Sequence, residues 1–267
     1  MSNEQTSLAE EGFLAGEVTA VVATIRARYS SHFQQLWALN RLLTSAQYDL
    51  RAHPESAQEL TCAVLFVRSL AHCQAVLILI ERGMLGPGRA VARCALEGLF
   101  NLGACAADAK LALSFVDADQ LDRRRRAKYL GQVQDPQAKA ALDKVELDEI
   151  LGAVQAKIDE VEAKDLKTRS MAKAAGLEDM YLTAYAMLSG AVHSTVGDLD
   201  QHFRFDPNGR MEMLTEPATE GLEGVLLILG ETMVSMVRAV SKVFELDIAD
   251  RCEQWLPEFK KLYATTG

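Results

Sequence analysis

Apolar residues recur at intervals of three and four along most of this chain, which is the spacing of amphipathic α-helices. The segment 55–82 is apolar on nearly every side of a helix, so we expect it to lie buried at the centre of a bundle. The pattern predicts helices over residues 8–28, 31–50, 55–82, 89–107, 110–132, 136–165, 177–194, 218–246 and 248–263.

Proline and glycine mark the breaks between these helices. Pro54 lacks the amide hydrogen that a helix interior requires, so one helix ends before it and another begins after it. The glycine-rich cluster at 83–88 predicts a sharp turn, and such a short connection favours antiparallel packing of the two helices that it joins. An alternating pattern over 203–213, interrupted by Asp-Pro-Asn-Gly, predicts a short β-hairpin. The expected fold class is therefore all-α, a multi-helix up-and-down bundle with one short hairpin near 203–213.

Composition agrees with a folded, helical chain. Hydrophobic residues make up 49% of the 267 residues, whereas only 6 are proline and 17 are glycine, so long uninterrupted helices are favoured. No repeat or flexible linker divides the sequence. We therefore expect one all-α domain over 1–267, in which 1–50 form a peripheral N-terminal helical region.

Charge and cysteines bear on partners and compartment. The formal net charge of −9 disfavours non-specific binding to nucleic acid or anionic lipid. The five cysteines include no Cys-x-x-Cys pair, which argues against a zinc knuckle or a disulfide framework and favours a reducing compartment. The N-terminus lacks the pattern of a signal peptide, and Arg68, His72 and Gln74 interrupt the most apolar segment. We expect a cytoplasmic protein without a membrane span.

One line of polar residues runs along the helix predicted over 89–107. Arg89, Arg93, Glu97 and Asn101 are spaced by four residues, so they share one slowly drifting face of an otherwise apolar helix. An unpaired buried charge costs several kcal/mol, so this line must meet polar groups or water.

A second polar line follows the helix predicted over 177–194. Tyr181, Tyr185, Ser189 and His193 have the same spacing of four, and the line ends in a histidine, which titrates near neutral pH. We expect the two lines to meet in one buried polar seam inside the bundle.

Two short motifs lie on these lines. The segment 89–98 reads RAVARCALEG and contains Arg-x3-Glu, and the segment 185–193 reads YAMLSGAVH and contains Ser-x3-His. With these motifs the chain resembles, over roughly residues 60–240, a bacterial all-α family of unknown function, DUF5677. That family is distantly similar to the HEPN helical bundles, many of which are ribonucleases of toxin–antitoxin and phage-defence systems. The resemblance implies an RNA-targeting protein of bacterial defence.

The HEPN signature is an arginine that precedes a histidine by four to six residues. No arginine precedes His193 at this distance. The sequence therefore leaves open whether the chain is an enzyme.

The polar seam is the candidate site. We expect His193, Glu97 and Arg93 as catalytic residues, since a histidine among arginines can support acid–base cleavage of a phosphodiester. No metal or cofactor is expected, because neither Glu-x-x-His nor His-Glu-x-x-His occurs. The residues expected to bind a ligand are Arg89, Asn101, Tyr185, Ser189, Arg125 and Lys128.

Weaker alternatives use the same residues. Ser189 and His193 are spaced to act as nucleophile and base, with Glu97 orienting the imidazole, but no nucleophile elbow is present. A metal site of His72, His193 and Glu97 would require three helices to converge. The basic run at 123–126 follows several aspartates, so a solvated helix face is favoured over an RNA track.

Three functions remain open. The first is RNA targeting through the seam. The second is a non-catalytic bundle that uses Arg89 and Arg93 to bind an anionic small molecule or a protein partner. The third is a structural or oligomeric protein in which the seam only fixes helix register. Homodimerisation through an apolar helix face is a further expectation, although no heptad repeat specifies it.

Overall fold

The structure, a computed structural model, describes residues 6–142, 147–193, 196–246 and 248, with positions 252, 255, 257 and 261. Helices dominate these residues, which confirms the all-α fold class. The longer helices are α2 (Val18–Arg28), α3 (Ser30–Gln47), α4 (Ala57–Glu81), α5 (Leu85–Ala107), α6 (Ala109–Leu130), α8 (Leu147–Val161) and α13 (Glu223–Val240). The shorter helical elements are α1 (Leu8–Glu11), η2 (Gly12–Leu14), α7 (Pro136–Leu142), α9 (Thr168–Ala174), α10 (Glu178–Met180), η3 (Tyr181–Tyr185), α11 (Ala186–His193), α12 (Val196–Leu199) and η4 (Asp200–His202).

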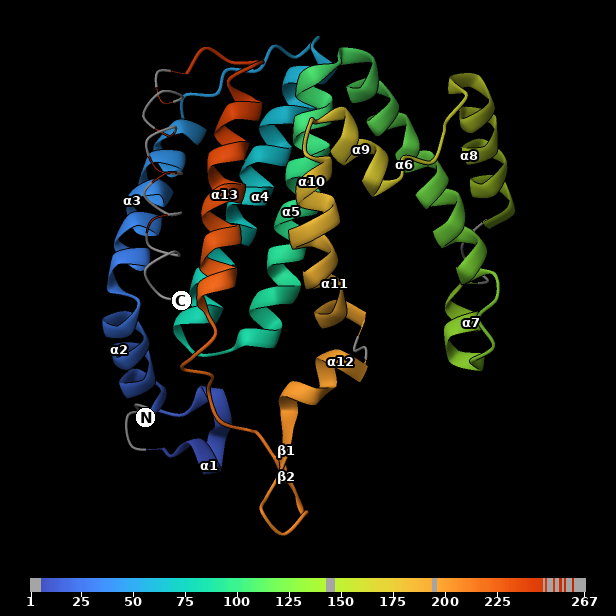
Figure 1. The fold of residues 1–267 in the computed structure, drawn as a ribbon. Coiled ribbons are helices and arrows are strands. Elements are labelled where there is room, and N and C mark those ends of the chain that lie inside the picture. Colours follow the sequence, from blue (N-terminus) through green and yellow to red (C-terminus); the bar gives the residue numbers. More distant parts are fainter. Residues whose placement is uncertain are drawn as a thin grey trace.

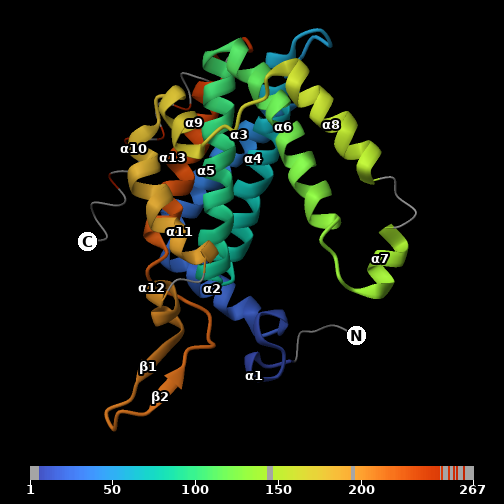
Figure 2. The same ribbon diagram turned by 90° about the vertical axis from the view of Figure 1, so that its right-hand side faces the viewer.

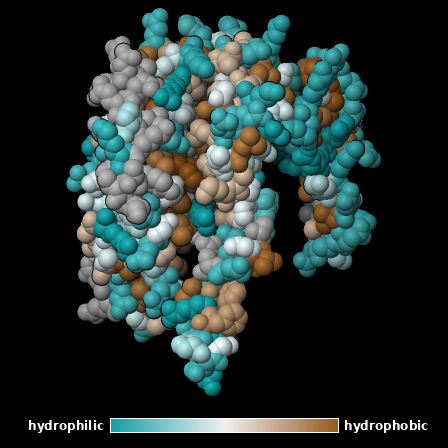
Figure 3. Space-filling model, in the orientation of Figure 1, coloured by the Kyte–Doolittle hydropathy of each residue, from teal (hydrophilic) through white to brown (hydrophobic). Residues whose placement is uncertain are grey.

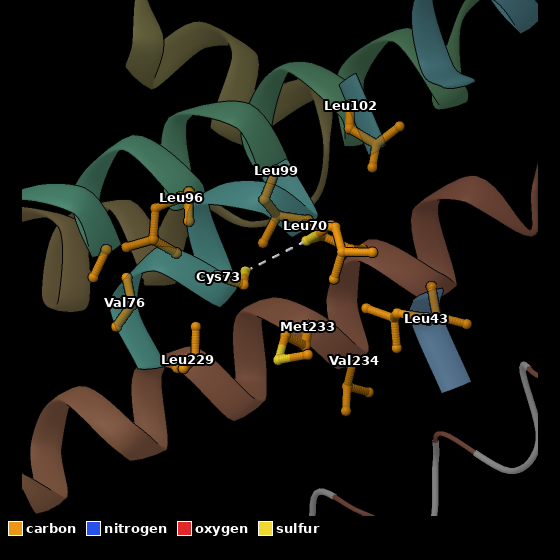
Figure 4. Close-up of a cluster of buried hydrophobic side chains, with 14 of the residues drawn as sticks. Leu43, Leu70, Cys73, Val76, Leu96, Leu99, Leu102, Leu229, Met233 and Val234 are labelled. Carbon is orange, nitrogen blue, oxygen red and sulfur yellow. Dashed lines mark hydrogen bonds between the residues drawn. The ribbon is translucent and has the colours of Figure 1, made fainter. Parts of the chain in front are cut away.

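The antiparallel helices α4 and α5 form the centre of the bundle, with α3 and α13 packed beside them (Figure 1). Buried aliphatic side chains of these helices face one another, and Cys73 Sγ lies 4.0 Å from Met236 Sδ (Figure 4). The two central helices lie close together at Gly98, where an added Cβ atom would lie 2.1 Å from the Ser69 hydroxyl oxygen. Because cores are packed without spare volume, this contact requires glycine.

The helix α3 also contributes to this core. Phe33, Leu36 and Leu39 are fully buried and belong to the same cluster as the central helices. The division of the chain into one domain with a peripheral region over 1–50 stays a prediction.

The turn between α4 and α5 is shorter than the predicted one at 83–88. The helix α5 already begins at Leu85, so Gly86 and Pro87 lie in its first turn. Proline is tolerated there because the first amides of a helix have no partner within it. Gly83 makes the turn itself, with a φ of 72° that favours glycine.

The N-terminal helix predicted over 8–28 is wrong as a single element. Gly12, with a φ of 56°, ends α1, and the helix α2 begins only at Val18. An isolated glycine inside a helical pattern is weak evidence for a break, which is why the periodicity of the segment missed it.

Several other helices differ in their bounds from the predicted ones. The segment 136–165 contains α7 and α8, and the second of these ends at Val161. The segment 177–194 contains α10, the π-helical turn η3 and α11. The last long helix starts at Glu223 instead of 218, and the helix predicted over 248–263 lies largely outside the described residues.

The helix α6 leaves the bundle body and packs along α8 (Figure 1). In the view turned by 90°, these helices lie on the opposite side of α5 from α11 (Figure 2). The surface over α6 and α8 is mostly hydrophilic, whereas the surface over the bundle body also shows patches of apolar residues (Figure 3).

The predicted hairpin near 203–213 is confirmed. Strands β1 (Phe203–Phe205) and β2 (Met211–Met213) are antiparallel, with Phe203 opposite Met213 and Phe205 opposite Met211. The hairpin projects from the end of the bundle at which α4 and α5 are joined (Figures 1 and 2).

Two helices, α4 and α5, are long and apolar enough to cross a membrane by length and composition. Within the bundle, 44% of the residues of the apolar window of α4 and 56% of those of α5 are buried. The absence of a membrane partner stays a prediction.

Candidate functional site

The two predicted polar lines lie on helices that contact each other. One line runs along α5, and the second runs through η3 and α11, which pack against α5. Two successive parts of this contact differ, and we call them its levels. At the closed level, around Tyr185, the side chains are packed and hydrogen-bonded. At the open level, around Ser189 and His193, they line a hollow.

The closed level is a chain of two hydrogen bonds. Arg93 Nη2 donates to the Tyr185 hydroxyl at 2.6 Å, and this hydroxyl donates to Glu97 Oε1 at 2.6 Å. Arg93 Nη2 also lies 3.2 Å from Glu97 Oε1, so the charges of the two helical neighbours compensate each other. These three residues form what we call the Arg93–Tyr185–Glu97 clasp.

Aromatic rings surround the clasp. The Tyr185 ring stacks on Tyr181 at 4.9 Å between centroids and packs against Phe100 at 5.9 Å. The guanidinium carbon of Arg93 lies 4.7 Å from the Tyr185 ring centroid, within the range of a cation–π contact. Burial, and then the hydrogen bond to the Glu97 carboxylate, raise the pKa of Tyr185, so its hydroxyl stays protonated and able to donate.

The open level is a hollow of about 430 Å³ between the start of α5 and the end of α11. Its walls include Arg89, Ser189, Gly190, His193 and Asp198, the last from α12. The imidazole of His193 is exposed, and Ser189 is half-buried. Arg89 and Asp198 each interact with other residues. We call this feature the Arg89–His193 hollow.

The structure divides the predicted catalytic residues between the two levels. His193 lines the hollow, whereas Arg93 and Glu97 are held in the clasp and do not line it. The carboxylate of Glu97 accepts from Tyr185, so this hydrogen bond does not orient the His193 imidazole. The prediction of one buried seam is wrong for the end that contains His193, because α11 lies at the surface and its histidine faces solvent.

The predicted ligand-binding residues are divided in the same way. Arg89 and Ser189 line the hollow, and Tyr185 belongs to the clasp. The half-buried Asn101 lies further along α5 and does not line the hollow. Arg125 and Lys128 are exposed on α6 and do not line the hollow.

The surroundings of the basic run agree with a solvated helix face. Arg123 and Arg125 form ion pairs with Asp119 and Asp122, respectively. These aspartates lie on the same helix, so part of the basic charge is neutralised locally.

Among the residues that the structure describes, no group of three or more histidine, cysteine, aspartate or glutamate side chains is arranged to hold a metal ion. His72, the third residue of the alternative metal site with Glu97 and His193, is half-buried on α4. Burial lowers its pKa, and the nearby Arg68 lowers it further.

Sequence reasoning missed the far wall of the hollow. Gly190 and Asp198 lie there, and so does Met187, which is largely exposed. Asp198 lies one helical element beyond the end of the second polar line, so no periodicity connects it with Arg89. The contact between α12 and α11 brings it to the site.

Comparison with known proteins gives a family. The profile of the family of unknown function DUF5677 matches residues 59–211, which include most of α4, all of α5, the clasp, the hollow and the start of β2. No curated protein and no solved structure shows a significant match to the chain. Since the profile covers more than half of the sequence, the chain belongs to the DUF5677 family.

Proposed function

We propose that the protein binds a phosphate-bearing ligand, RNA or a free nucleotide, in the Arg89–His193 hollow. The observation that carries the proposal is that Arg89, Ser189 and His193, from two helices far apart in sequence, line one open hollow. A guanidinium group donates two parallel hydrogen bonds to phosphate oxygens, and a hydroxyl and an imidazole add further donors.

The other wall of the hollow suits a nucleotide more than a bare anion. Asp198 repels phosphate but can accept a hydrogen bond from a ribose hydroxyl, as acidic residues do in dinucleotide sites. Gly190 carries no side chain, which leaves room for a ligand beside Ser189. With the net charge of −9, binding depends on these local donors and not on the overall field of the protein.

RNA cleavage is the second candidate, because the exposed His193 stands beside Arg89 in the hollow. In this reaction the neutral imidazole takes the proton of a ribose 2′-hydroxyl, whose oxygen attacks the phosphorus atom. The bond to the 5′-oxygen breaks, a 2′,3′-cyclic phosphate forms, and water gives a proton to the leaving oxygen. A HEPN-like role in cytoplasmic bacterial defence depends on this second candidate.

A binding experiment with two ligands tests the proposal. Fluorescence anisotropy with a labelled single-stranded RNA, and calorimetry with adenosine monophosphate, report which source of phosphate is bound. Arg89→Ala removes the main phosphate donor and should weaken binding at least tenfold, as expected for a lost charge-assisted hydrogen bond. Arg123→Ala is the matched control, since it removes the same charge from the exposed surface of α6.

The same experiment separates binding from cleavage. His193→Ala should abolish cleavage of end-labelled RNA while changing RNA affinity less than Arg89→Ala does. Intact RNA with the wild-type protein would reject cleavage and leave binding in place. Failure of the wild-type protein to bind either ligand at millimolar concentration would reject the proposal.

A further inference from the structure

The β1–β2 hairpin forms one wall of a cavity of about 820 Å³. In an antiparallel pair, directly opposed residues share a face, and Arg204 is opposed to Glu212, with which it forms an ion pair at 2.8 Å. Arg204 lines the cavity, and so does His202, whose backbone oxygen accepts a hydrogen bond from the amide of Leu214. The volume lies within the range of about 300–1,000 Å³ that is typical of small-molecule sites. We call this feature the hairpin cavity.

Three other parts of the chain complete the walls of the hairpin cavity. They are the α4–α5 turn with the start of α5, the segment 214–220 that follows β2, and Phe13 of η2. A backbone hydrogen bond joins the first two, since the Ala218 amide donates to the Gly83 oxygen at 2.9 Å. An added Cβ atom at Gly83 would lie 2.6 Å from Pro217 Cβ, so these two segments are also in tight contact. The cavity is therefore formed by segments that are fixed to one another.

The walls of the hairpin cavity combine an apolar part with a charged part. The large half-buried side chains are apolar, namely Phe13, Met84 and Leu85. The charged or titratable side chains are all exposed, namely His202, Arg204, Glu216 and Glu220. A ligand that matches this arrangement has an apolar group that contacts the half-buried walls and a polar group that stays near solvent.

The basic side of the hairpin cavity can hold a carboxylate. Arg204 donates to Glu212 through Nε, which leaves its two Nη groups as donors for a ligand. The His202 Nε2 atom lies 3.9 Å from the position of a Cβ atom added at Gly86, so the glycine leaves room beside the imidazole. A guanidinium group and an imidazole together can donate to both oxygens of a carboxylate.

The acidic side of the hairpin cavity can hold an ammonium group. Glu220 is compensated by an ion pair with Arg28 at 2.8 Å. Glu216, by contrast, forms no ion pair or side-chain hydrogen bond within the part of the chain that the structure describes. A ligand with only a negative charge would be repelled by Glu216, and a ligand with only a positive charge would leave the donors of Arg204 unused.

We infer that the hairpin cavity binds an α-amino acid with a large apolar side chain. This class of ligand carries a carboxylate and an ammonium group on one carbon atom, so it meets both sides of the cavity at once. The carboxylate accepts from Arg204 and His202, and the ammonium group donates to Glu216. The apolar side chain packs against Phe13 and Met84, where its burial stabilises the complex.

Calorimetry with three related probes tests the inference. L-Phenylalanine carries both charged groups, 3-phenylpropionate lacks the ammonium group, and 2-phenylethylamine lacks the carboxylate. L-Phenylalanine should bind at least tenfold more tightly than either of the others, as expected when one charge-assisted hydrogen bond is lost. Absence of L-phenylalanine binding at millimolar concentration, or equal affinity for the three probes, would overturn the inference.

Charge variants test the role of each side of the cavity. Glu216→Gln should weaken the binding of L-phenylalanine at least tenfold without weakening that of 3-phenylpropionate. Arg204→Gln should weaken the binding of both carboxylates without weakening that of 2-phenylethylamine. Arg210→Gln is the matched control, because this exposed arginine of the same hairpin does not line the cavity. The same loss for all three probes in either cavity variant would reject the assigned roles.

Filling the cavity tests where the ligand binds. Gly86→Leu places a side chain beside His202 and should abolish the binding of L-phenylalanine. Gly152→Leu is the matched control, because this helical glycine of α8 has no atom within 4 Å of an added Cβ. Retained binding in the Gly86→Leu protein, with an unchanged circular dichroism spectrum, would reject the hairpin cavity as the site.

The inference is independent of the function proposed for the Arg89–His193 hollow. Arg89 does not line the hairpin cavity, so Arg89→Ala should leave the affinity for L-phenylalanine unchanged. Adenosine monophosphate should not compete with L-phenylalanine for the same reason. Competition between the two ligands would show that they share one site and would contradict the inference.

Discussion

The clasp and the hollow are neighbouring levels of one helix–helix contact, yet they differ in what they leave available. In the Arg93–Tyr185–Glu97 clasp, the charges of one helix are paired with each other and with a buried phenol through Arg93 Nη2. One turn of α5 away, Arg89 stands at an open hollow with an exposed histidine on the facing helix. The same spacing of polar residues therefore serves packing at one level and provides a surface for a ligand at the next.

The difference shows why a line of polar residues is an ambiguous signal. A buried polar group must find a partner, so a satisfied network and a binding site look alike in a sequence. What separates them here is the depth of the segment formed by η3 and α11: Tyr185 in η3 is buried in the bundle, whereas His193 at the end of α11 is exposed. Stability should thus depend on the clasp, and ligand binding on the hollow.

The largest effect is expected from Tyr185→Ala. This substitution removes a buried ring that contacts Phe100, Tyr181 and Arg93, and it should lower the free energy of unfolding by about 3–5 kcal/mol. Urea denaturation monitored by circular dichroism gives the value. Leu182→Ala, at an exposed position of the same π turn, is the control and should cost much less. Equal losses in both variants would remove the distinction between the clasp and the surface.

A smaller loss is expected from Tyr185→Phe, which keeps the ring and removes only the hydroxyl. Both hydrogen bonds of the clasp disappear, although Arg93 and Glu97 remain paired with each other, so we expect a loss of about 1–2 kcal/mol in unfolding free energy. Tyr48→Phe, on an exposed tyrosine, is the matched control and should change stability by less than half of that amount. An unchanged stability of Tyr185→Phe would show that the phenol is not required for the contact.

The raised pKa of Tyr185 predicts an alkaline dependence of the same stability difference. A group whose pKa is raised in the folded protein contributes stability fully below its unfolded pKa of ~10, and this contribution is lost as the pH rises through the folded pKa. The advantage of the wild-type protein over Tyr185→Phe should therefore be constant from pH 7 to about 9.5 and shrink above pH 10. An advantage that grows at alkaline pH would contradict the assignment.

The smallest effects on stability are expected in the hollow. His193→Ala alters an exposed residue and should change the unfolding free energy by about 0.5 kcal/mol or less. Arg89→Ala removes a half-buried side chain that interacts with another residue, so it should cost about 1 kcal/mol. Unfolding of these variants and of Tyr185→Phe under the same conditions compares the free energies that the hollow and the clasp contribute. A loss above 2 kcal/mol in either hollow variant would place Arg89 or His193 in the structural network instead.

Periodicity was sufficient to predict most of the fold, because the spacing of apolar residues indicates which face of a helix is buried. The pair α4 and α5, the turn at Gly83 and the hairpin around Asp206 follow from local sequence. The break in the N-terminal segment did not follow from local sequence, since a single glycine is weak evidence for the positive φ that Gly12 adopts.

The candidate site was predictable only in part. Spacing by four identified the residues of both lines, and the structure joins Arg93, Glu97 and Tyr185 as their complementary chemistry suggests. Depth was not predictable, because the apolar residues of α11 include Met187, which is 65% exposed. A helix with apolar residues on several faces does not show which of them other elements will cover.

The π turn at Tyr181–Tyr185 has a consequence for how this protein can change in length. A π turn accommodates one residue more than an α turn without interrupting the helix. Loss of a single codon at Thr183, an exposed position, would remove this extra residue and let η3 continue as regular helix, with the register of the flanking turns nearly kept. The same loss in the regular helix α5 would turn all preceding side chains by about 100° relative to the following ones and would separate Arg93 from its partners. The π turn is thus a place where the chain can shorten by one residue at little cost to the packing around it.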